Sequence, residues 1–531
     1  MLKVVGRREA ELTFMKLIHL LEGLKEYDLT GDPELEIEGL AYDSRQIKPG
    51  HLFVALQGHA LNGHHYLGDA VQNGAVALIG EKFSGLRGNL TKVRVPNSRE
   101  ALSKLAARFY DYPFRGVNLI GITGTNGKTT TSYLLESILT VGGKKPGVIG
   151  TINYRYLGKT HDAPVTTPES LDLMRFLREM GDAGVTEVIM EVSSHALDQK
   201  RTGECPFKLG VFTNFSRDHL DYHKTMEEYF KAKSLLFQGL KKGKPDAGST
   251  AVINMDDPRG EQLAALTEAP VVTYGLDQKW DVRGERLSAD RTGLKARLMT
   301  PVGEVDIRSS LIGEMNIYNI LAASAAALSL NVHLDAVAEG IERLGMVPGR
   351  LELVKNQSGL NLVVDYAHTP DALLKTLTNL RPIVDGRLIT VFGCGGDRDK
   401  GKRSEMGLVA GENSDLVFIT SDNPRSEDPL SIIAQIEKGI QATGLIRLNN
   451  SAQRPFTGSG YFVEADRRRA IRKAVALADE TDLVLIAGKG HEDYQIVGGE
   501  RKRFDDRKEA ARAASKAGHE SSASVLMTHD E

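Results

Sequence analysis

The residues with the clearest chemical potential form a glycine-rich loop, Gly124-Thr125-Asn126-Gly127-Lys128-Thr129-Thr130, here called the phosphate loop. An apolar, strand-like run over 118–123 precedes it, and a helix-like run over 131–139 follows it. Strand, loop and helix in this order direct backbone N–H groups and a helix dipole at an anion, and Lys128 adds a full charge. Thr129 stands where such loops place their Mg²⁺ ligand. The strict pattern has glycine where this chain has Ile122, which leaves an ordinary glycine-rich turn as the alternative; we interpret the loop as an ATP site.

Polar side chains also follow two later apolar runs. Ligands of open α/β sheets bind at the carboxyl ends of strands, so these positions are candidates for a site. Glu191 ends one run, and a carboxylate there suits Mg²⁺ held near ATP phosphates, although a solvated strand end is the alternative. The segment 214–223 follows the next run and contains Asp218 and His219. Metal or substrate contact and a structural role both remain open for this segment.

A lysine completes the apolar face of a predicted helix. Thr225 and Glu228 form a capping box at its start. The apolar stripe that follows consists of Met226, Tyr229, Phe230, Leu236 and Phe237. At helical spacing Lys233 falls on that stripe, while Lys231 falls on the opposite side. An inward lysine should have a depressed pKa unless it is paired, and a snorkelling lysine is the alternative.

Charged residues follow three predicted strands in the last third of the chain. Arg398 and Arg425 offer forks for carboxylates, and Asp422 and Glu492 are partners for ammonium groups. We call these four residues the charged rim. The segment 393–403 lacks the G-x-G-x-x-G spacing, which argues against a nicotinamide cofactor. The rim suits a zwitterion with more than one carboxylate, whereas solvated loops would explain any single member.

The elements that would position these groups alternate between strand and helix patterns in three blocks. They predict an α/β protein with domains at 1–115, 116–349 and 350–531. Apolar runs in the second block are typical of parallel strands buried on both faces. Between Val271 and Ile312 the pattern changes to short alternating strands, which we interpret as a small β insertion. A helix is expected over Tyr318–Leu330, and a frayed tail is expected from about Ala511.

Composition is that of a large globular enzyme. The 531 residues are 41% hydrophobic and 26% charged, and their net charge of −3 gives no general attraction to nucleic acid or membrane. Cys205 and Cys394 are far apart, which suits a reducing compartment. No apolar run approaches a membrane span or a signal peptide, so we expect a cytoplasmic protein. Met1 and Met15 are alternative translation starts, and an amphipathic helix is expected to begin at Met15.

Taken together, five groups of residues resemble the Mur ligases of bacterial cell-wall synthesis: 124–130, 191–195, Asp218-His219, Lys233 and Asp365-Tyr366-Ala367-His368. The resemblance extends from about Leu17 to Lys508. The segment 422–425, with Gly488 and Glu492, is most similar to members that add meso-diaminopimelate to UDP-N-acetylmuramoyl-L-alanyl-D-glutamate. The resemblance implies an N-terminal UDP-binding α/β domain, a central parallel-sheet ATPase domain and a C-terminal Rossmann-like domain.

The resemblance also implies a role for each matching residue. Nucleotide contacts would be the phosphate loop with Asn316, Arg350 and Asp365. UDP-sugar contacts would be Ser44, His59, Thr166, Thr167, Ser193, Gln199 and Arg201. Diaminopimelate contacts would be Arg398, Asp422, Asn423, Pro424, Arg425, Gly488 and Glu492. Thr129, Glu191, His219 and Lys233, the last as a carbamate, would hold a pair of Mg²⁺ ions, and Lys128, Lys233, His219 and Glu191 would be catalytic.

The implied reaction makes an amide in the cytoplasmic synthesis of peptidoglycan precursors. ATP would phosphorylate the D-glutamate side-chain carboxylate, and the diaminopimelate amine would attack the acyl phosphate. We expect a monomer that binds only small molecules and closes its domains around them. Two other classes compete: a related ligase that adds a different group, which should lack the charged rim, and a nucleotide switch, which gives no reason for Lys233, Arg398 and Arg425 to coexist.

Overall fold

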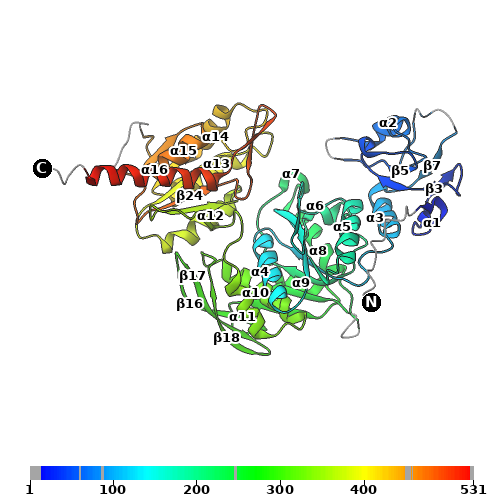
Figure 1. The fold of residues 1–531 in the computed structure, drawn as a ribbon, viewed down its shortest axis with the longest axis horizontal. Helices are drawn as coiled ribbons and strands as arrows, with labels where there is room; N and C mark the ends of the chain where they lie inside the picture. Colours follow the sequence, from blue (N-terminus) through cyan, green and yellow to red (C-terminus); the bar gives the residue numbers. More distant parts are fainter. Residues whose placement is uncertain are drawn as a thin grey trace, which may run out of the picture.

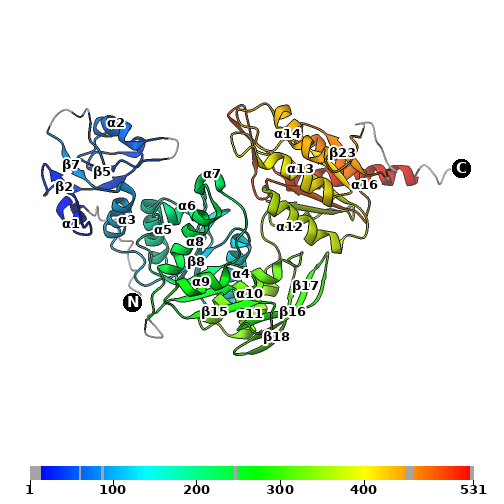
Figure 2. The same cartoon turned by 180° about the vertical axis from the view of Figure 1, so that it is seen from behind.

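The structure is a computed structural model that describes residues 14–58, 61–84, 86, 89–243, 248–448, 456 and 458–526. Three large sheets follow one another along the chain, with their strands in 28–94, 118–309 and 352–487. The central part (cyan and green) lies between the N-terminal part (blue) and the C-terminal part (yellow to red) in Figure 1, and Figure 2 shows the same arrangement from behind. This is the three-domain α/β architecture that the sequence predicts.

The N-terminal domain is built on a five-stranded sheet in the order β2-β7-β6-β5-β4, parallel except for β2. Its strands are β2 (Asp28–Thr30), β4 (Gly39–Ala41), β5 (His51–Val54), β6 (Ala77–Gly80) and β7 (Thr91–Arg94), beside a separate pair of β1 (Met15–Lys16) and β3 (Glu36–Ile37). Its helices are α1 (Leu17–Leu21), η1 (Ser44–Gln46), η2 (Gly63–Tyr66), α2 (Leu67–Gln72) and α3 (Ser98–Phe109). The helix expected from Met15 begins at Leu17 as α1, because Met15 and Lys16 pair with β3, and Leu17, Leu20 and Leu21 are buried in the core.

The central domain is built on an eleven-stranded sheet in the order β11-β10-β9-β12-β8-β13-β14-β15-β16-β17-β18. Strands from β9 to β16 in this order are parallel. The residues of β9, β12, β8, β13 and β14 are mostly apolar and buried because helices cover both faces. The strands are β8 (Asn118–Thr123), β9 (Pro146–Ile149), β10 (Asn153–Tyr156), β11 (Lys159–Asp162), β12 (Glu187–Glu191), β13 (Phe207–Phe212), β14 (Thr250–Asn254) and β15 (Val271–Gly275). The helices are α4 (Lys128–Val141), α5 (Ser170–Asp182), α6 (Ser194–Asp198), α7 (Leu220–His223), α8 (Met226–Gln238), α9 (Gly260–Leu266), α10 (Asn316–Ser329) and α11 (Leu334–Arg343).

The region expected to be a small β insertion is an extension of the main sheet, which corrects that prediction. β16 (Val282–Asp290) pairs with β15, and β17 (Gly293–Thr300) and β18 (Gly303–Ser309) continue the sheet as antiparallel strands. These strands join the main sheet because of the core that their apolar face covers. That face, which includes Leu294, Leu298 and Ile307, packs into the same core as α4 and α10 instead of forming a core of its own.

The C-terminal domain is built on a six-stranded sheet in the order β19-β20-β24-β21-β22-β23, parallel except for β19. Its strands are β19 (Glu352–Leu353), β20 (Asn361–Asp365), β21 (Leu388–Phe392), β22 (Leu416–Ile419), β23 (Gly460–Val463) and β24 (Leu483–Ala487), followed by the hairpin β25 (Tyr494–Val497) and β26 (Glu500–Arg503). Its helices are α12 (Pro370–Leu380), η3 (Arg381–Ile383), α13 (Lys402–Asn413), α14 (Pro429–Gln441), α15 (Arg467–Leu477) and α16 (Asp506–Leu526).

The tail predicted to be frayed from Ala511 is helical as far as Leu526, which corrects a second prediction. Ala510, Ala513 and Ala514 lie on one face of α16 and are buried against the C-terminal core. Alanine favours the helix intrinsically, so a composition that suggested disorder instead forms a docked helix. Within the described residues, no helix is both long enough and apolar enough to cross a membrane.

Candidate active site

The phosphate loop connects the end of β8 to the start of α4, as its sequence predicts. Gly124 and Gly127 have φ angles of 146° and 85°, which glycine adopts without strain. A Cβ at Gly127 would also lie 2.3 Å from Asn319 Oδ1. The segment after β13 holds the loop, because Thr125 N and Asn126 N donate to the carbonyl and the side-chain oxygen of Asn214 over 2.9 Å each. The loop is therefore fixed at both ends before any nucleotide binds.

Two lysines share one carbonyl of this loop. Lys128 Nζ donates to Gly124 O and Thr125 O over 2.9 Å each, and Lys233 Nζ donates to Gly124 O over 2.8 Å. Lys233 is 2% exposed on the inner face of α8, whereas Lys231 is exposed, which confirms the predicted helix face. Burial, and then the charge of Lys128, lowers the pKa of Lys233 well below its ordinary value. Burial also lowers the pKa of Lys128.

Glu191 is a buried carboxylate beside the loop, not a solvated strand end. It is 1% exposed at the end of β12, and Thr129 Oγ1 donates to its Oε2 over 2.9 Å. Thr151 donates to the same carboxylate from its amide and from its hydroxyl. Arg350, from the start of the C-terminal domain, donates to Thr129 Oγ1 over 3.3 Å. A carboxylate and a hydroxyl that already touch form a suitable oxygen-donor pair for Mg²⁺.

His219 belongs to a group of aromatic side chains on the far side of the two lysines. It has a φ of 53° and precedes α7, and its ring lies 4.9 Å from that of His195 and 5.9 Å from that of Tyr229. Asp218 lies beside it, 3.5 Å from its Nε2. Burial lowers the pKa of both His195 and His219 to about 4. A neutral imidazole is the form that can bind a metal.

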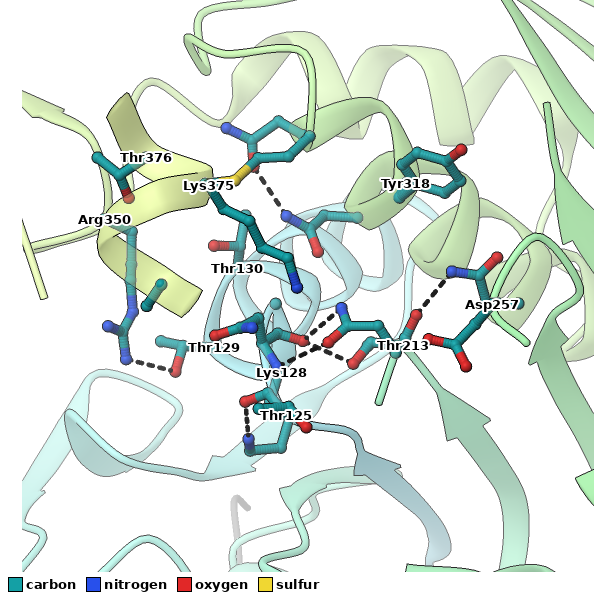
Figure 3. Close-up of a pocket in the computed structure, with 18 of the residues that line it drawn as sticks. Thr125, Lys128, Thr129, Thr130, Thr213, Asp257, Tyr318, Arg350, Lys375 and Thr376 are labelled. Carbon is teal, nitrogen blue, oxygen red and sulfur yellow. Dashed lines mark hydrogen bonds between the residues drawn. The ribbon is translucent and has the colours of Figure 1, made fainter. Parts of the chain in front are cut away.

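A cavity of about 950 Å³ joins these groups to the C-terminal domain (Figure 3). Arg350 and Lys375 enter it from the C-terminal side, opposite Lys128 and Thr129. Asp371 Oδ2, at the start of α12, accepts hydrogen bonds from Asn126 Nδ2 and Ser216 Oγ over 3.1 and 2.7 Å. Predicted residues that line the cavity are Thr125, Asn126, Gly127, Lys128, Thr129, Thr130, Thr166, Glu191, Ser193, His219, Lys233, Asn316, Arg350 and Asp365.

The central residues predicted to contact the UDP-sugar form one hydrogen-bonded group next to this cavity. Thr167 Oγ1 accepts from Ser193 N over 3.0 Å, and Arg201 donates to Thr167 O over 2.9 Å and to Gln199 Oε1 over 2.7 Å. Thr166 Oγ1 lies 3.1 Å from Thr151 Oγ1, which connects this group to Glu191.

The N-terminal member of that set lies apart from it. Ser44 is in η1, where its carbonyl accepts from Asn73 Nδ2, and within the described ranges no hydrogen bond joins it to the central group. His59 lies outside the described residues. The two domains do meet nearby, because Arg99 of α3 pairs with Glu169 over 2.6 Å and Glu169 lies 3.7 Å from Arg201.

The predicted diaminopimelate residues lie together at the carboxyl ends of β21, β22 and β24. Asn423 Nδ2 donates to Glu492 Oε2 over 2.9 Å, and a Cβ added to Gly488 would lie 2.6 Å from Asp422 Oδ2. The Pro424 carbonyl accepts from Glu427 N over 3.0 Å. Arg398 is exposed, on the loop whose Gly395 lies beside Arg425. None of these residues lines the nucleotide cavity, so the structure contains two separate polar sites.

Arg425 has a left-handed backbone, with a φ of 53°, that the following hairpin holds in place. Its amide donates to Ile496 O over 3.0 Å, and its carbonyl accepts from Gly498 N over 2.8 Å. Its Nη1 donates to Gly396 O over 2.6 Å. A strained non-glycine residue fixed by two backbone bonds is typical of a functional position.

Family profiles match nearly all of this architecture: the Mur ligase middle domain at 122–327, the Mur ligase glutamate ligase domain at 349–490 and the Mur ligase family catalytic domain at 36–110. The chain is 48% identical over 505 residues to the UDP-N-acetylmuramoyl-L-alanyl-D-glutamate--2,6-diaminopimelate ligase of Geobacter metallireducens, with 94% of this chain and 98% of that protein covered. It belongs to the Mur ligase family.

Further relatives agree. The ligase of the same name from Geobacter sulfurreducens is 46% identical over 503 residues and also covers 94% of this chain and 98% of its own length. A solved structure of a protein with that name is 33% identical and has a TM-score of 0.65, with 96% of this chain and 100% of the solved chain covered.

The structure of this Mur ligase adds site residues that the sequence did not assign. Lys489, which lies between the predicted residues Gly488 and Glu492, is buried, and its Nζ is 3.2 Å from Asn423 Oδ1 and 2.9 Å from Glu492 Oε2. Thr151 supports Glu191, and Asn214, the first residue of the predicted segment 214–223, supports the phosphate loop. Thr151 follows β9, so a fuller search at strand ends could have found it, whereas the burial of Lys489 has no signal in a single sequence.

The candidate metal donors of this Mur ligase do not form a closed cage. Within the described residues, no three His, Cys, Asp or Glu side chains are grouped closely enough to hold an ion. The candidate donors that line the cavity are Thr129, Glu191 and His219, together with Lys233. Open oxygen donors of this kind fit Mg²⁺, which keeps water and substrate phosphate oxygens among its ligands.

Proposed function

We propose that this Mur ligase joins 2,6-diaminopimelate to UDP-N-acetylmuramoyl-L-alanyl-D-glutamate at the expense of ATP, in the cytoplasmic synthesis of peptidoglycan precursors. One observation carries the proposal. The chain combines a phosphate-loop cavity with a separate charged rim, over the same full length as relatives that bear this name. The first site uses ATP to activate the substrate carboxylate, and the second site selects the amino acid.

The phosphate loop activates the substrate carboxylate. A carboxylate at neutral pH has no leaving group, so amide formation needs an acyl phosphate. On nucleotide binding, the Lys128 ammonium turns from Gly124 O and Thr125 O to the γ-phosphoryl group and stabilises the charge that develops during transfer. Mg²⁺ bound by Thr129 and Glu191, with His219 nearby, supplies further charge neutralisation when present.

Lys233 acts in this proposal as a carbamate. Its neutral amine is favoured by burial and by the neighbouring ammonium of Lys128, and the neutral amine is the form that reacts with CO₂. The new N–C bond replaces an N–H bond, and the released proton leaves to solvent. The product is an anion beside the Lys128 ammonium, so an attractive ion pair replaces a neutral amine and an additional oxygen donor faces the cavity.

The charged rim recognises the amino acid. Asp422 and Glu492 suit an ammonium group, while Arg425 and Arg398 suit the distal carboxylate that distinguishes diaminopimelate from lysine. A site built for a charged group rejects the analogue that lacks it, because its own buried groups are then left unpaired. The meso isomer is the proposed substrate because segment 422–425 resembles that of family members that add this isomer.

The UDP-sugar would extend from the Thr167, Ser193 and Arg201 group toward the N-terminal domain, to Ser44 and His59. Three substrates bound mainly by three domains require closure before the chemical step. The protein is proposed to act as a monomer, because each of these groups comes from one chain.

The deciding experiment measures ATP hydrolysis with the purified protein. It supplies the UDP-muramoyl dipeptide alone, diaminopimelate alone, and both together, and it then replaces diaminopimelate by lysine or ornithine. We expect phosphate release and a tripeptide product only with dipeptide and diaminopimelate together. Hydrolysis that needs neither substrate would favour a nucleotide switch, and equal rates with lysine would overturn the assignment of the rim.

A further inference from the structure

A fully buried ion pair lies directly beneath the charged rim. Arg467, the first residue of α15, donates from Nε and Nη2 to the Asp506 carboxylate over 2.8 and 2.7 Å. Both side chains are 0% exposed. Asp506 is the first residue of α16, so the pair joins two helices at the same end of the C-terminal sheet.

The remaining donors of Arg467 contact the two chain segments that carry the rim. Nη2 donates to Ala487 O over 2.9 Å, and Nη1 donates to Ser421 O over 3.4 Å. These carbonyls belong to the residues immediately before Gly488 and Asp422. Ala487 is the last residue of β24, and Ser421 lies just after β22. These two strands are not neighbours in the sheet, because β21 lies between them. One guanidinium therefore spans the gap between two rim segments.

The two rim segments above this pair lie close together. A Cβ on Gly488 would lie 2.6 Å from Asp422 Oδ2, so the two segments approach as closely as a glycine allows. Beyond them, Asn423 and Lys489 both contact Glu492. A shift of one segment against the other would change the spacing between the groups assigned to the amino acid.

Stability alone does not account for a pair of this kind. Removing two charges from water is costly, and an apolar pair of similar volume is often as stable. What an ionic pair adds is fixed geometry, because a guanidinium donates in a rigid planar fork. Here the fork is directed at two backbone carbonyls of the binding rim.

We propose that Arg467 and Asp506 are positioning residues that set the distance between the Asp422 and Gly488 segments and thereby the affinity and selectivity for diaminopimelate. The inference rests on the proposed function of the rim. It also makes the start of α16, at the end of the chain, a part of the amino-acid site. Neither residue touches the cavity that takes the nucleotide.

The same domain offers a matched control at the opposite end of the sheet. Arg387 precedes β21, and its Nε and Nη2 pair with Asp482, which precedes β24, over 3.2 and 2.5 Å. Asp482 is 2% exposed, and Arg387 also donates to Leu477 O over 2.8 Å. This pair has the same chemistry and a carboxylate that is nearly as buried, with Arg387 itself 18% exposed, and it lies away from every rim residue.

The test compares Arg467→Lys and Asp506→Asn with Arg387→Lys in the full-length protein. Steady-state assays determine kcat and the KM for diaminopimelate, ATP and the UDP-muramoyl dipeptide, and thermal melting reports the stability of each variant. We expect the KM for diaminopimelate to rise on the order of 10- to 100-fold in both rim-side variants, the range that lost supporting contacts produce. The KM for ATP should stay within about 3-fold of wild type, and the preference for diaminopimelate over lysine should fall.

Each outcome has a distinct meaning. Arg387→Lys should lower the melting temperature without changing the KM for diaminopimelate. The inference is overturned if Arg467→Lys and Asp506→Asn keep the wild-type KM and selectivity, or if the KM values for diaminopimelate, ATP and the dipeptide all rise together in these two variants. If Arg467→Lys does not fold, Asp506→Asn, which keeps shape and one acceptor oxygen, decides alone. Failure of the wild-type protein to use diaminopimelate would instead overturn the proposed function.

Discussion

Replacing Lys233 by methionine tests whether this lysine works as an anion. In the unmodified protein, Lys128 Nζ and Lys233 Nζ lie 2.9 and 2.8 Å from the same oxygen, Gly124 O, so the two nitrogens are at most about 5.7 Å apart. With an effective dielectric constant of about 20, two like charges at that separation repel by about 3 kcal/mol. A carbamate at Lys233 reverses the sign of this interaction.

Two effects follow from that magnitude. In CO₂-free buffer, Lys233 avoids this repulsion only by giving up its proton, at a cost of at least about 3 kcal/mol. Lys233→Met removes that cost but also a hydrogen bond worth about 1 kcal/mol, which leaves a net gain of about 2 kcal/mol. For a domain of this size the melting temperature should then rise by about 4 to 8 °C. Bicarbonate should raise the melting temperature of wild type but not that of the variant. Ligation by the variant should fall by at least about 100-fold, as expected when a preorganised charge is lost.

The assay is thermal melting in degassed buffer with and without bicarbonate, together with phosphate release from ATP in the presence of dipeptide and diaminopimelate. Lys231→Met, on the exposed face of the same helix, is the control and should change neither measurement. Near-normal ligation by Lys233→Met would refute the reasoning. An equal bicarbonate shift in wild type and Lys233→Met would refute it as well.

Three further predictions concern other parts of the site. Arg425→Ala should reduce diaminopimelate discrimination by on the order of 10⁴-fold while the ATP dissociation constant changes less than about 3-fold; near-normal kcat/KM for diaminopimelate would contradict this. Gly127→Ala should cost about 1 to 3 kcal/mol and weaken ATP binding at least about tenfold, because its φ is 85° and its Cβ would meet Asn319 at 2.3 Å; unchanged calorimetric affinity would disprove it. Burial lowers the pKa of His491 to about 3, so the unfolded chain takes up a proton that the folded protein refuses, and stability is lost as pH falls from about 6.5 toward 3. His491→Gln should therefore lose less melting temperature than wild type between pH 7 and pH 5, and equal losses would count against this assignment.

The sequence predicted the phosphate loop and the inward face of α8, because both depend on residues that are close together in the chain. The phosphate loop needs adjacent glycines and a lysine, and Lys233 was found from helical spacing alone; the structure places both at Gly124 O. Thr225 also caps α8, with its Oγ1 accepting from Glu228 N over 3.2 Å, but its own amide donates to His223 O instead of to the Glu228 side chain, so only half of the predicted capping box is present. In each case neighbouring residues along the chain determine the conformation.

The other predictions failed where packing between distant parts of the chain decides the structure. The alternating strands at β16–β18 show that their faces are apolar, but not which core those faces cover. The alanine-rich end looks weakly apolar by composition, yet Ala510 and Ala514 are fully buried once α16 docks. Lys489 shows the same limit within the site, because its two acceptors come from residues both near and far in sequence.

The wall of the nucleotide cavity is also the seam between two domains. Asp371 and Arg350, on the C-terminal side, hydrogen-bond to Asn126 and Thr129 of the phosphate loop. A nucleotide in the cavity would therefore contact both domains, and any movement of the C-terminal domain relative to the central one would make or break contacts with it. Under the proposed function, ATP binding and ADP release are thus coupled to the movement that brings the amino acid to the activated carboxylate and then away from it.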